Sequence, residues 1–365
     1  MIRTAAVVGT GLIGTSAGLA LSRRGVRVHL LDIDEGAARV AAARGAGAFG
    51  PPAERVDLAV IAVPPTRVAQ VLAQQQRLGL AHAYTDVASV KSPTTPAVSG
   101  AEVEDSTYVG GHPMAGSELS GPLAARADLF EDCTWVLTPG PRTSSAALNR
   151  TLAAVSLCGA LPVVMEPSAH DRAVALVSHA PHLVATLMAA RLGGAPREAL
   201  DLAGRGVRDV IRVAGGDPAL WTDIIRSNAS AVAEILGEVM KDLEALTGAL
   251  NALELSAPDT EDALGTVKEL LLRGREGWEA VYEPGRTAAG QVTLTVPIAD
   301  RPGEVDRLID AAQGAGMCPD GIDLCWSEGS AELSARLAAP PLTAESVRHR
   351  LADGGWRVSV AATSS

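Results

Sequence analysis

One histidine in this sequence is placed to take a proton from a substrate. His112 lies in the segment GGHPMAG, at the end of a strand-like run over residues 106–112. Open α/β sheets bind ligands at strand ends, and a neutral imidazole there can accept a hydroxyl proton while the attached carbon gives up hydride. A lone histidine at a strand end is also a common structural feature, so the residues alone leave both interpretations open.

A glycine pattern near the N-terminus predicts a dinucleotide site. The pattern GxGxxG follows the apolar run 4–9 and opens a helical pattern that reaches residue 24. There the first glycine permits a tight turn, the second lets backbone N–H groups approach a pyrophosphate, and the third lets the helix pack closely on the strand. The predicted cofactor-binding residues are Gly9, Gly11, Leu12, Ile13 and Gly14.

Asp32 narrows the prediction to one cofactor. It ends a second strand-like run, VRVHLLD, where a carboxylate accepts hydrogen bonds from the adenosine ribose and repels a 2′-phosphate. The sequence therefore favours NAD over NADP. Val63 and Pro64, at the end of a further strand, are predicted to line the same crevice, although a strand that simply ends at a proline has the same pattern.

Arg212 is the candidate anion-binding residue. It lies in the apolar helical segment VIRVA, where a guanidinium needs an anionic partner, and a substrate carboxylate can pair with it through two hydrogen bonds. The alternative is a structural ion pair with Asp209 or Asp217.

The periodicity of the chain predicts an α/β protein with three domains. Strand-like runs alternate with helical or polar segments, as in a mostly parallel sheet that is covered on both faces. These runs cover residues 4–9, 26–32, 57–63, 83–89, 106–112 and 133–139.

Three ranges follow from this pattern. Residues 1–166 are predicted to form a Rossmann-type dinucleotide-binding domain, and residues 167–282, which have helical periodicity, an all-helical substrate and dimerisation domain. Residues 290–361 follow the order β-α-β-β-α-β, which predicts a ferredoxin-like domain.

Four ordered segments resemble the prephenate/arogenate dehydrogenase (cyclohexadienyl dehydrogenase) family. They are DVASVK (86–91), GGHPMAGSELSG (110–121), HDRAVALVSHAPHLVA (170–185) and VRDVIRVAGGDPALW (207–221). The resemblance implies NAD-dependent oxidative decarboxylation of prephenate to 4-hydroxyphenylpyruvate, in tyrosine biosynthesis. Arogenate and 4-amino-4-deoxyprephenate are the alternative substrates.

The same resemblance assigns roles to residues. It makes His112 the catalytic histidine and Ser89 the residue that hydrogen-bonds both His112 and the substrate hydroxyl. It makes Arg212 the residue that holds a substrate carboxylate. Further residues are implied to form the pocket and its mouth, namely His182, Trp221, Ser117 and Glu118.

The chain departs from the family pattern at three positions. Ala88 stands where the family commonly has Gly, Ile211 where it has Thr, and Gly216 where it has Ser. The last two flank Arg212, so they put the identity of the substrate in doubt more than the reaction type.

The C-terminal residues resemble an ACT-type regulatory domain. Asp300, Pro302 and Gly303 lie in a strand-to-helix turn, where backbone N–H groups suit the carboxylate of an amino-acid effector. A domain that only dimerises, or that has lost its ligand, fits the short motif equally well.

Composition limits the partners of the chain. A formal charge of −11 and a pI of about 5.2 argue against binding to nucleic acid or an anionic membrane. The four cysteines form no CxxC pair and no secretory leader pattern is present, so a reducing cytoplasm is expected.

The apolar run 173–190 contains histidines and a proline, which favours a buried helix over a membrane span. The apolar helices also favour a homodimer.

Two further histidine patterns are interpreted as structural. His179 and His182 lie three residues apart but have no third ligand at a suitable spacing, so no metal is expected. His170 and Asp171, near the start of a helix, are interpreted as a cap rather than a catalytic dyad. A non-catalytic nucleotide and amino-acid sensor is the alternative from another class, but a sensor would need no proton acceptor.

Overall fold

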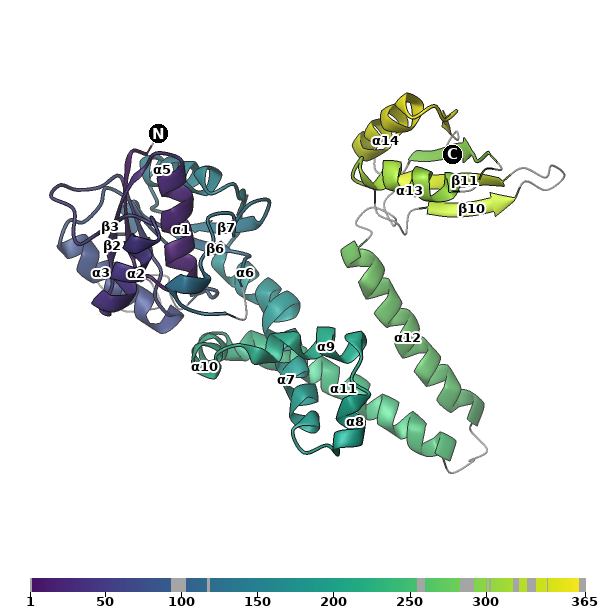
Figure 1. Cartoon of the computed structure of the whole chain (residues 1–365). Coiled ribbons are helices and arrows are strands. Elements are labelled where there is room, and N and C mark those ends of the chain that lie inside the picture. The colour runs from purple at the N-terminus through teal and green to yellow at the C-terminus, as the bar shows by residue number, and fades with distance from the viewer. Residues whose placement is uncertain are drawn as a thin grey trace. The chain divides into compact units, whose positions relative to one another are not determined.

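A computed structural model of the chain describes residues 2–92, 103–116, 119–254, 260–282, 292–299, 301, 303–317, 322–326, 333–339 and 341–360. The chain divides into two compact units, Met1–Met240 and Lys241–Ser365 (Figure 1). The first unit contains the predicted α/β domain and most of the predicted helical segments. The boundaries predicted at residues 166 and 282 are a finer division and stay predictions.

An eight-stranded sheet forms the centre of the first unit. Its strand order is β3-β2-β1-β4-β5-β6-β7-β8, and neighbouring strands are parallel except for β6 and β7. Strands added on both sides of β1 give the predicted doubly wound, Rossmann-type arrangement. The strands are β1 (Thr4–Val8), β2 (Arg27–Leu31), β3 (Ala48–Phe49), β4 (Leu58–Ile61), β5 (Tyr84–Asp86), β6 (Tyr108–Pro113), β7 (Thr134–Pro139) and β8 (Leu161–Val164).

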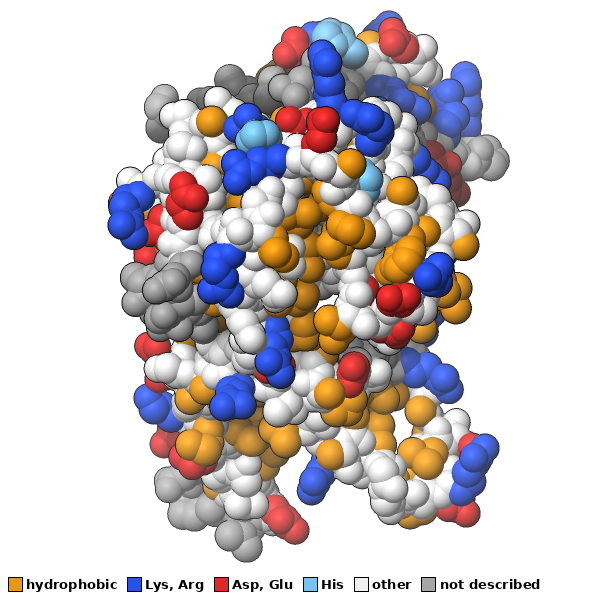
Figure 2. Space-filling model, turned by 90° about the vertical axis from the view of Figure 1, so that its left-hand side faces the viewer, with side chains coloured by type: hydrophobic (Ala, Val, Ile, Leu, Met, Phe, Trp, Pro, Cys, Tyr) orange, Lys and Arg blue, Asp and Glu red, His pale blue; other side chains and the backbone are white. Residues whose placement is uncertain are grey.

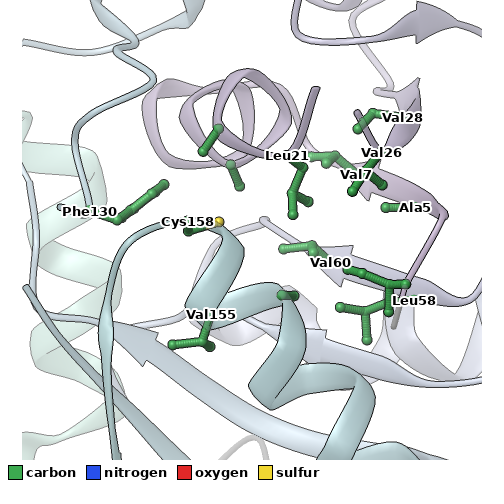
Figure 3. Close-up of a cluster of buried hydrophobic side chains, with 14 of the residues drawn as sticks. Ala5, Val7, Leu21, Val26, Val28, Leu58, Val60, Phe130, Val155 and Cys158 are labelled. Atoms are coloured by element: carbon green, nitrogen blue, oxygen red, sulfur yellow. The ribbon is translucent and has the colours of Figure 1, made fainter. Parts of the chain in front are cut away.

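Helices cover both faces of this sheet. They include α1 (Leu12–Arg23), α2 (Glu35–Ala43), α3 (Pro65–Arg77) and α5 (Ser145–Leu157). Along β1 and β4, alternate side chains enter two different hydrophobic clusters, because successive strand residues point to opposite faces. Val7 and Val60 pack with Leu21 of α1 on one face (Figure 3), while Ile61 packs with Leu72 of α3 on the other. Burial of each such side chain contributes about 1.5–3 kcal/mol.

A group of helices follows the sheet. They are α6 (Pro167–Val174), α7 (Ala180–Leu192), α8 (Arg197–Asp201), α9 (Arg205–Ile211), α10 (Pro218–Ser227) and α11 (Ala229–Glu254). A π-helical turn, Ala175–His179, joins α6 to α7. Pro181 lies in the first turn of α7 and has no N–H to donate, and the wider turn before it lets the helix continue.

The segment Pro167–Leu192 is long and apolar enough to cross a membrane by length and composition alone. Within it, however, His170, Asp171 and His179 are buried and hydrogen-bonded to other parts of the first unit. These contacts support the predicted packed helix rather than a membrane span.

The second unit contains a four-stranded antiparallel sheet in the order β10-β11-β9-β12. Its elements are α12 (Thr260–Tyr282), β9 (Val292–Pro297), α13 (Glu304–Gln313), β10 (Ile322–Trp326), β11 (Leu333–Ala339), α14 (Pro341–Asp353) and β12 (Ser359–Val360). Leu308 of α13 and Val347 of α14 pack with Leu294 and Leu337 of the sheet. From β9 onward the elements have the predicted β-α-β-β-α-β order.

On the face in Figure 2, the described residues carry charges of both signs. On the face in Figure 2, hydrophobic side chains gather around a hollow, with Lys and Arg interspersed among Asp and Glu. This face therefore has no extended cationic area of the kind that holds nucleic acid.

Candidate active site

The turn between β1 and α1 has the geometry of a dinucleotide cradle. Gly9 has a φ of 102°, and a Cβ there would lie 2.2 Å from the carbonyl oxygen of Ala62, so only glycine fits. At Gly11 a Cβ would meet nothing within 4 Å, and no side chain caps the start of α1. The first N–H groups of the helix therefore have open space before them, which fits the diphosphate of a dinucleotide.

A cavity of about 1250 Å³ lies beside this turn. It opens where β1 and β4 are neighbours and the strand order reverses, which is the usual ligand-binding position in open α/β sheets. Most of the predicted cofactor residues line it, namely Gly11, Leu12, Ile13, Gly14, Val63 and Pro64.

Asp32 lies next to the glycine turn but not among the residues that line the cavity. Its Oδ2 accepts hydrogen bonds from the backbone N–H of Thr10 at 2.6 Å and from the Thr10 hydroxyl at 2.7 Å. Its Oδ1 accepts one from the N–H of Asp34 at 3.0 Å. Asp32 thus fastens the turn to the end of β2, a role that was not predicted. Its contact with the ribose stays a prediction.

The Asp32→Ala substitution is expected to raise the KM for NAD by about 10-fold, because a charged hydrogen bond and a fastening of the turn are lost together. The KM for NADP should rise less, because the repulsion of the 2′-phosphate is also lost. Initial rates with each cofactor measure the ratio of the two constants. Asp34→Ala, which removes only the cap of α2, is the control. If Asp32→Ala leaves the ratio of the KM values for NAD and NADP unchanged, Asp32 does not bind the ribose.

His112 and Ser89 line the same cavity from two adjacent strands. His112 lies near the end of β6, and Ser89 lies just beyond the end of β5. The structure therefore brings the predicted base, the predicted hydroxyl partner and the glycine turn together. The hydrogen bond between Ser89 and His112 stays a prediction.

A buried ion pair lies below these two residues. Lys91 is completely buried, pairs with Asp86 and donates a hydrogen bond to the carbonyl oxygen of Gly111 at 2.7 Å. The hydroxyl of Tyr108 donates to the same Asp86 carboxylate at 2.5 Å. A Cβ on Gly111 would lie 2.5 Å from the carbonyl oxygen of Asp86. The glycine before His112 thus allows β5 and β6 to approach, and the ion pair fastens the segment after β5 to β6.

The imidazole of His112 is hydrogen-bonded to a second histidine. His112 Nδ1 lies 2.9 Å from His170 Nε2, and His170 Nδ1 lies 2.8 Å from Asp171 Oδ1. Asp171 also accepts hydrogen bonds from the backbone N–H groups of Lys91 and Ser92, both at 2.7 Å. Burial, followed by electrostatic repulsion from His170 and Lys91, holds the pKa of His112 well below its usual value. His112 is therefore uncharged at neutral pH, as a proton acceptor must be.

The interpretation of His170 and Asp171 as a helix cap is wrong. The N-cap of α6 is Glu166, whose side chain accepts a hydrogen bond from the N–H of Ala169 at 3.0 Å. His170 and Asp171 lie within the helix and are buried. The helix begins at Pro167, a few residues earlier than a cap at His170 requires.

His179 also lines the cavity, although no catalytic or substrate-binding role was predicted for it. The side-chain amide of Asn228 donates to its Nδ1 at 3.1 Å, and to the carbonyl oxygen of Asp171 at 2.9 Å. Burial lowers the pKa of His179 to about 4, so this ring too is neutral at neutral pH. The polar residues beside the cavity thus come from α6, the π-helical turn and the turn between α10 and α11.

Trp221 lines the cavity, and His182, which is not among the lining residues, stacks against the indole ring of Trp221. The two rings are stacked, with centroids 3.4 Å apart and an interplanar angle of 14°. A Cβ on Gly216 would lie 2.7 Å from Trp221 Nε1. The indole therefore occupies the space that a side chain at position 216 would need, which gives a physical reason for this departure from the family pattern.

Arg212 is not among the residues that line the cavity. Arg212 is exposed and begins a 3-10 turn, Arg212–Gly215, directly before the lining residue Gly216. In the described lining the cationic side chains are Arg67 of α3 and Arg226 of α10. The carboxylate-binding role of Arg212 stays a prediction, and Arg226 is a competing candidate. The sequence did not single out Arg226, because an arginine on an amphipathic helix is ordinarily solvated.

The remaining predicted residues can be placed only in part. Ser117, Glu118, Asp300 and Pro302 lie outside the described residues, while Gly303 precedes α13 with a φ of 79°. Within the part of the chain that the structure describes, no three His, Cys, Asp or Glu side chains are grouped to hold a metal ion.

Comparisons with known proteins agree with this geometry. The family model for the nucleotide-binding domain of prephenate dehydrogenase matches residues 17–164, and that for its dimerization domain matches residues 166–264. A Streptomyces niveus protein described as probable prephenate dehydrogenase NovF is 41% identical over 360 residues, which cover 97% of this chain and 99% of that protein. Prephenate dehydrogenase of Bacillus subtilis is 30% identical over 253 residues, or 66% of this chain and 68% of that protein.

Solved structures share the fold. Prephenate dehydrogenase of Aquifex aeolicus, solved with hydroxyphenyl propionate and NAD+, has a TM-score of 0.64 and 24% identity, covering 76% of this chain and 98% of that one. Arogenate dehydrogenase of Synechocystis has a TM-score of 0.58 and 26% identity, covering 75% and 99%. With a nucleotide cradle and an uncharged histidine on one cavity, with two family models over residues 17–264 and with a 41% identical relative along nearly its whole length, this chain belongs to the prephenate dehydrogenase family of NAD-dependent oxidoreductases.

Proposed function

We propose that the chain converts prephenate to 4-hydroxyphenylpyruvate, as a step of tyrosine biosynthesis, with His112 as the general base. The observation that carries this proposal is the uncharged imidazole of His112 on the cavity that the glycine turn also lines. A protein that only senses nucleotides would have no use for an uncharged proton acceptor on this cavity.

The residues divide the work of the reaction. His112 takes the proton of the substrate hydroxyl, and Ser89 orients that hydroxyl toward it. Gly11 and Gly14 of the glycine turn would hold NAD, which would supply the acceptor for the hydride of the carbon that carries the hydroxyl. Arg212 holds a substrate carboxylate, and the stacked rings of Trp221 and His182 form an apolar wall beside it. Formation of the aromatic ring then drives the loss of the other carboxylate as carbon dioxide.

The main alternative substrate is 4-amino-4-deoxyprephenate, the analogue of prephenate that has an amine in place of the hydroxyl. Ile211 and Gly216 depart from the family pattern beside Arg212, the predicted carboxylate-binding residue, and this departure leaves the amino analogue open as a substrate. Initial rates of NAD reduction with prephenate, arogenate and 4-amino-4-deoxyprephenate decide between them. We expect the highest kcat/KM with prephenate. A higher value with either other acid would reassign the substrate, and no NADH from any of them would favour a sensor.

We also propose that the chain works as a soluble, cytoplasmic homodimer. Residues 166–264 match a dimerization domain, and large apolar side chains are exposed there, including Leu176, Val177, Leu187, Met188 and Leu202. Pairing of two copies would remove such surface from water. Sedimentation at micromolar concentration tests this, and a monomer would contradict it.

The β9–β12 part of the chain is proposed to be an ACT-type domain. Its β-α-β-β-α-β order and the left-handed Gly303 at the turn into α13 support this proposal. An amino-acid effector at that turn would show as a change of prephenate turnover when tyrosine is added. Identical rates with and without tyrosine would count against tyrosine as the effector.

A further inference from the structure

Asp171 is held as a carboxylate inside the protein. Burial opposes its ionisation, but hydrogen bonds from His170, Ser92 and Lys91 outweigh burial and keep the pKa of the carboxyl group below its usual value. An ionised carboxylate can only accept hydrogen bonds. The proton between Asp171 Oδ1 and His170 Nδ1 therefore belongs to His170.

This assignment fixes both imidazoles in turn. When His170 is uncharged it has one N–H and one lone pair, so a proton on its Nδ1 leaves a lone pair on its Nε2. The 2.9 Å contact then requires His112 Nδ1 to donate. His112 Nε2 is left without a proton, and it is the nitrogen that can act as a base.

We propose that His170 and Asp171 are positioning residues that set the tautomer of His112 and hold its ring, so that Nε2 is the basic nitrogen. This inference rests on the proposed role of His112 as the general base. When His112 gains a proton at Nε2, its Nδ1–H becomes a charge-assisted donor to His170, and the negative charge of Asp171 lies behind that ring. The hydrogen bond to His170 therefore selects the Nδ1–H tautomer of neutral His112 and also stabilises the imidazolium that forms when His112 takes up a proton.

The Asp171 carboxylate also holds the segment that contains Ser89 in position. Asp171 accepts hydrogen bonds from the backbone N–H groups of Lys91 and Ser92, which lie two and three residues after Ser89 in the chain. Lys91 in turn bonds the carbonyl oxygen of Gly111, next to His112. One residue of α6 therefore fixes the base and the segment with the predicted hydroxyl partner relative to each other.

Substitutions of His170 test the proposal. His170→Leu leaves His112 Nδ1–H without an acceptor, and kcat for prephenate should fall by about 10- to 100-fold while the KM for NAD stays within about twofold. His170→Gln can place an amide oxygen where Nε2 was, and should return kcat to within about fivefold of the wild type. His82→Gln, at an exposed histidine, is the control. If His170→Leu leaves kcat unchanged, or if Gln rescues no better than Leu, the proposal is overturned.

A double-mutant cycle separates positioning from general damage. If His170 acts through His112, then His170→Leu should cost less than about twofold in kcat when His112 is already Asn. The full loss in that background would show a merely structural role and overturn the proposal. If His112→Asn alone keeps wild-type turnover, the proposed function fails before the question of His170 arises.

The tautomer can also be observed without turnover. Histidine-selective ¹⁵N NMR of the cofactor-free protein should show one imidazole, absent in His112→Asn, with Nδ1 protonated and Nε2 bare. His170→Leu should shift this ring towards the other tautomer. A wild-type ring with the proton on Nε2 would contradict the assignment directly.

Discussion

His112→Asn is expected to reduce kcat for prephenate by about 10²- to 10⁴-fold, the usual contribution of a positioned general base. Asparagine keeps a polar group of similar reach at the end of β6 but cannot accept the hydroxyl proton. The glycine turn is untouched, so the Kd for NAD should change by less than about twofold. Steady-state NADH formation gives kcat, and fluorescence titration with NAD gives the Kd.

The pH dependence of the wild type gives an independent check on His112. The base works only when neutral, and burial holds its pKa well below the usual 6.5. Lowering the pH from neutral through 6.5 should therefore leave kcat/KM nearly unchanged, and activity should decline only when the pH reaches the lowered pKa. A decline centred near pH 6.5, or retained turnover in His112→Asn, would assign the proton transfer to another group.

Arg212→Met should raise the KM for prephenate by up to about 100-fold, because a charged hydrogen bond to a carboxylate contributes about 1.5–3 kcal/mol. Methionine keeps the length and apolar character of the side chain, so the turn Arg212–Gly215 should persist. The KM for NAD and the melting temperature should change little, since the residue is exposed. Initial rates over a range of prephenate concentrations measure the effect.

Arg226→Met is the matched comparison, because Arg226 lines the cavity and Arg212 does not. If Arg212 binds the carboxylate, the rise in the KM for prephenate should be much smaller for Arg226→Met. The reverse order would transfer the role to Arg226 and would show that the resemblance misled at this position. Equal, small effects would remove both residues from carboxylate binding.

The α/β part of the fold could be predicted because its signals are local. A strand, a GxGxxG turn and a helix lie within a few dozen residues, and alternation along β1 and β4 reflects burial on both faces. The strands β3 and β8 were not predicted. β3 has only two residues, and the side chains of both strands are exposed, so neither shows a pattern of burial.

The histidine chain behind His112 could not be predicted, for a different reason. His112 and His170 are far apart in the sequence, and nothing in either segment tells which helix residue meets which strand end. The one available signal was a polar pair inside an apolar helix, since buried polar groups need partners. The hydrogen bonds from Thr10 to Asp32 were also missed, because the two residues are 22 positions apart and the sequence does not show that they meet.

The placement of Asp171 limits how the protein can be divided. Cutting the chain after residue 166 would keep the sheet and the glycine turn, yet it would remove the partner of two backbone N–H groups at Lys91 and Ser92. The fragment could still bind nucleotide, but its imidazole at the end of β6 would be free to rotate. Nucleotide binding and proton abstraction are thus not separable modules, and a chimera that exchanges the helical part must bring its own carboxylate to the same spot.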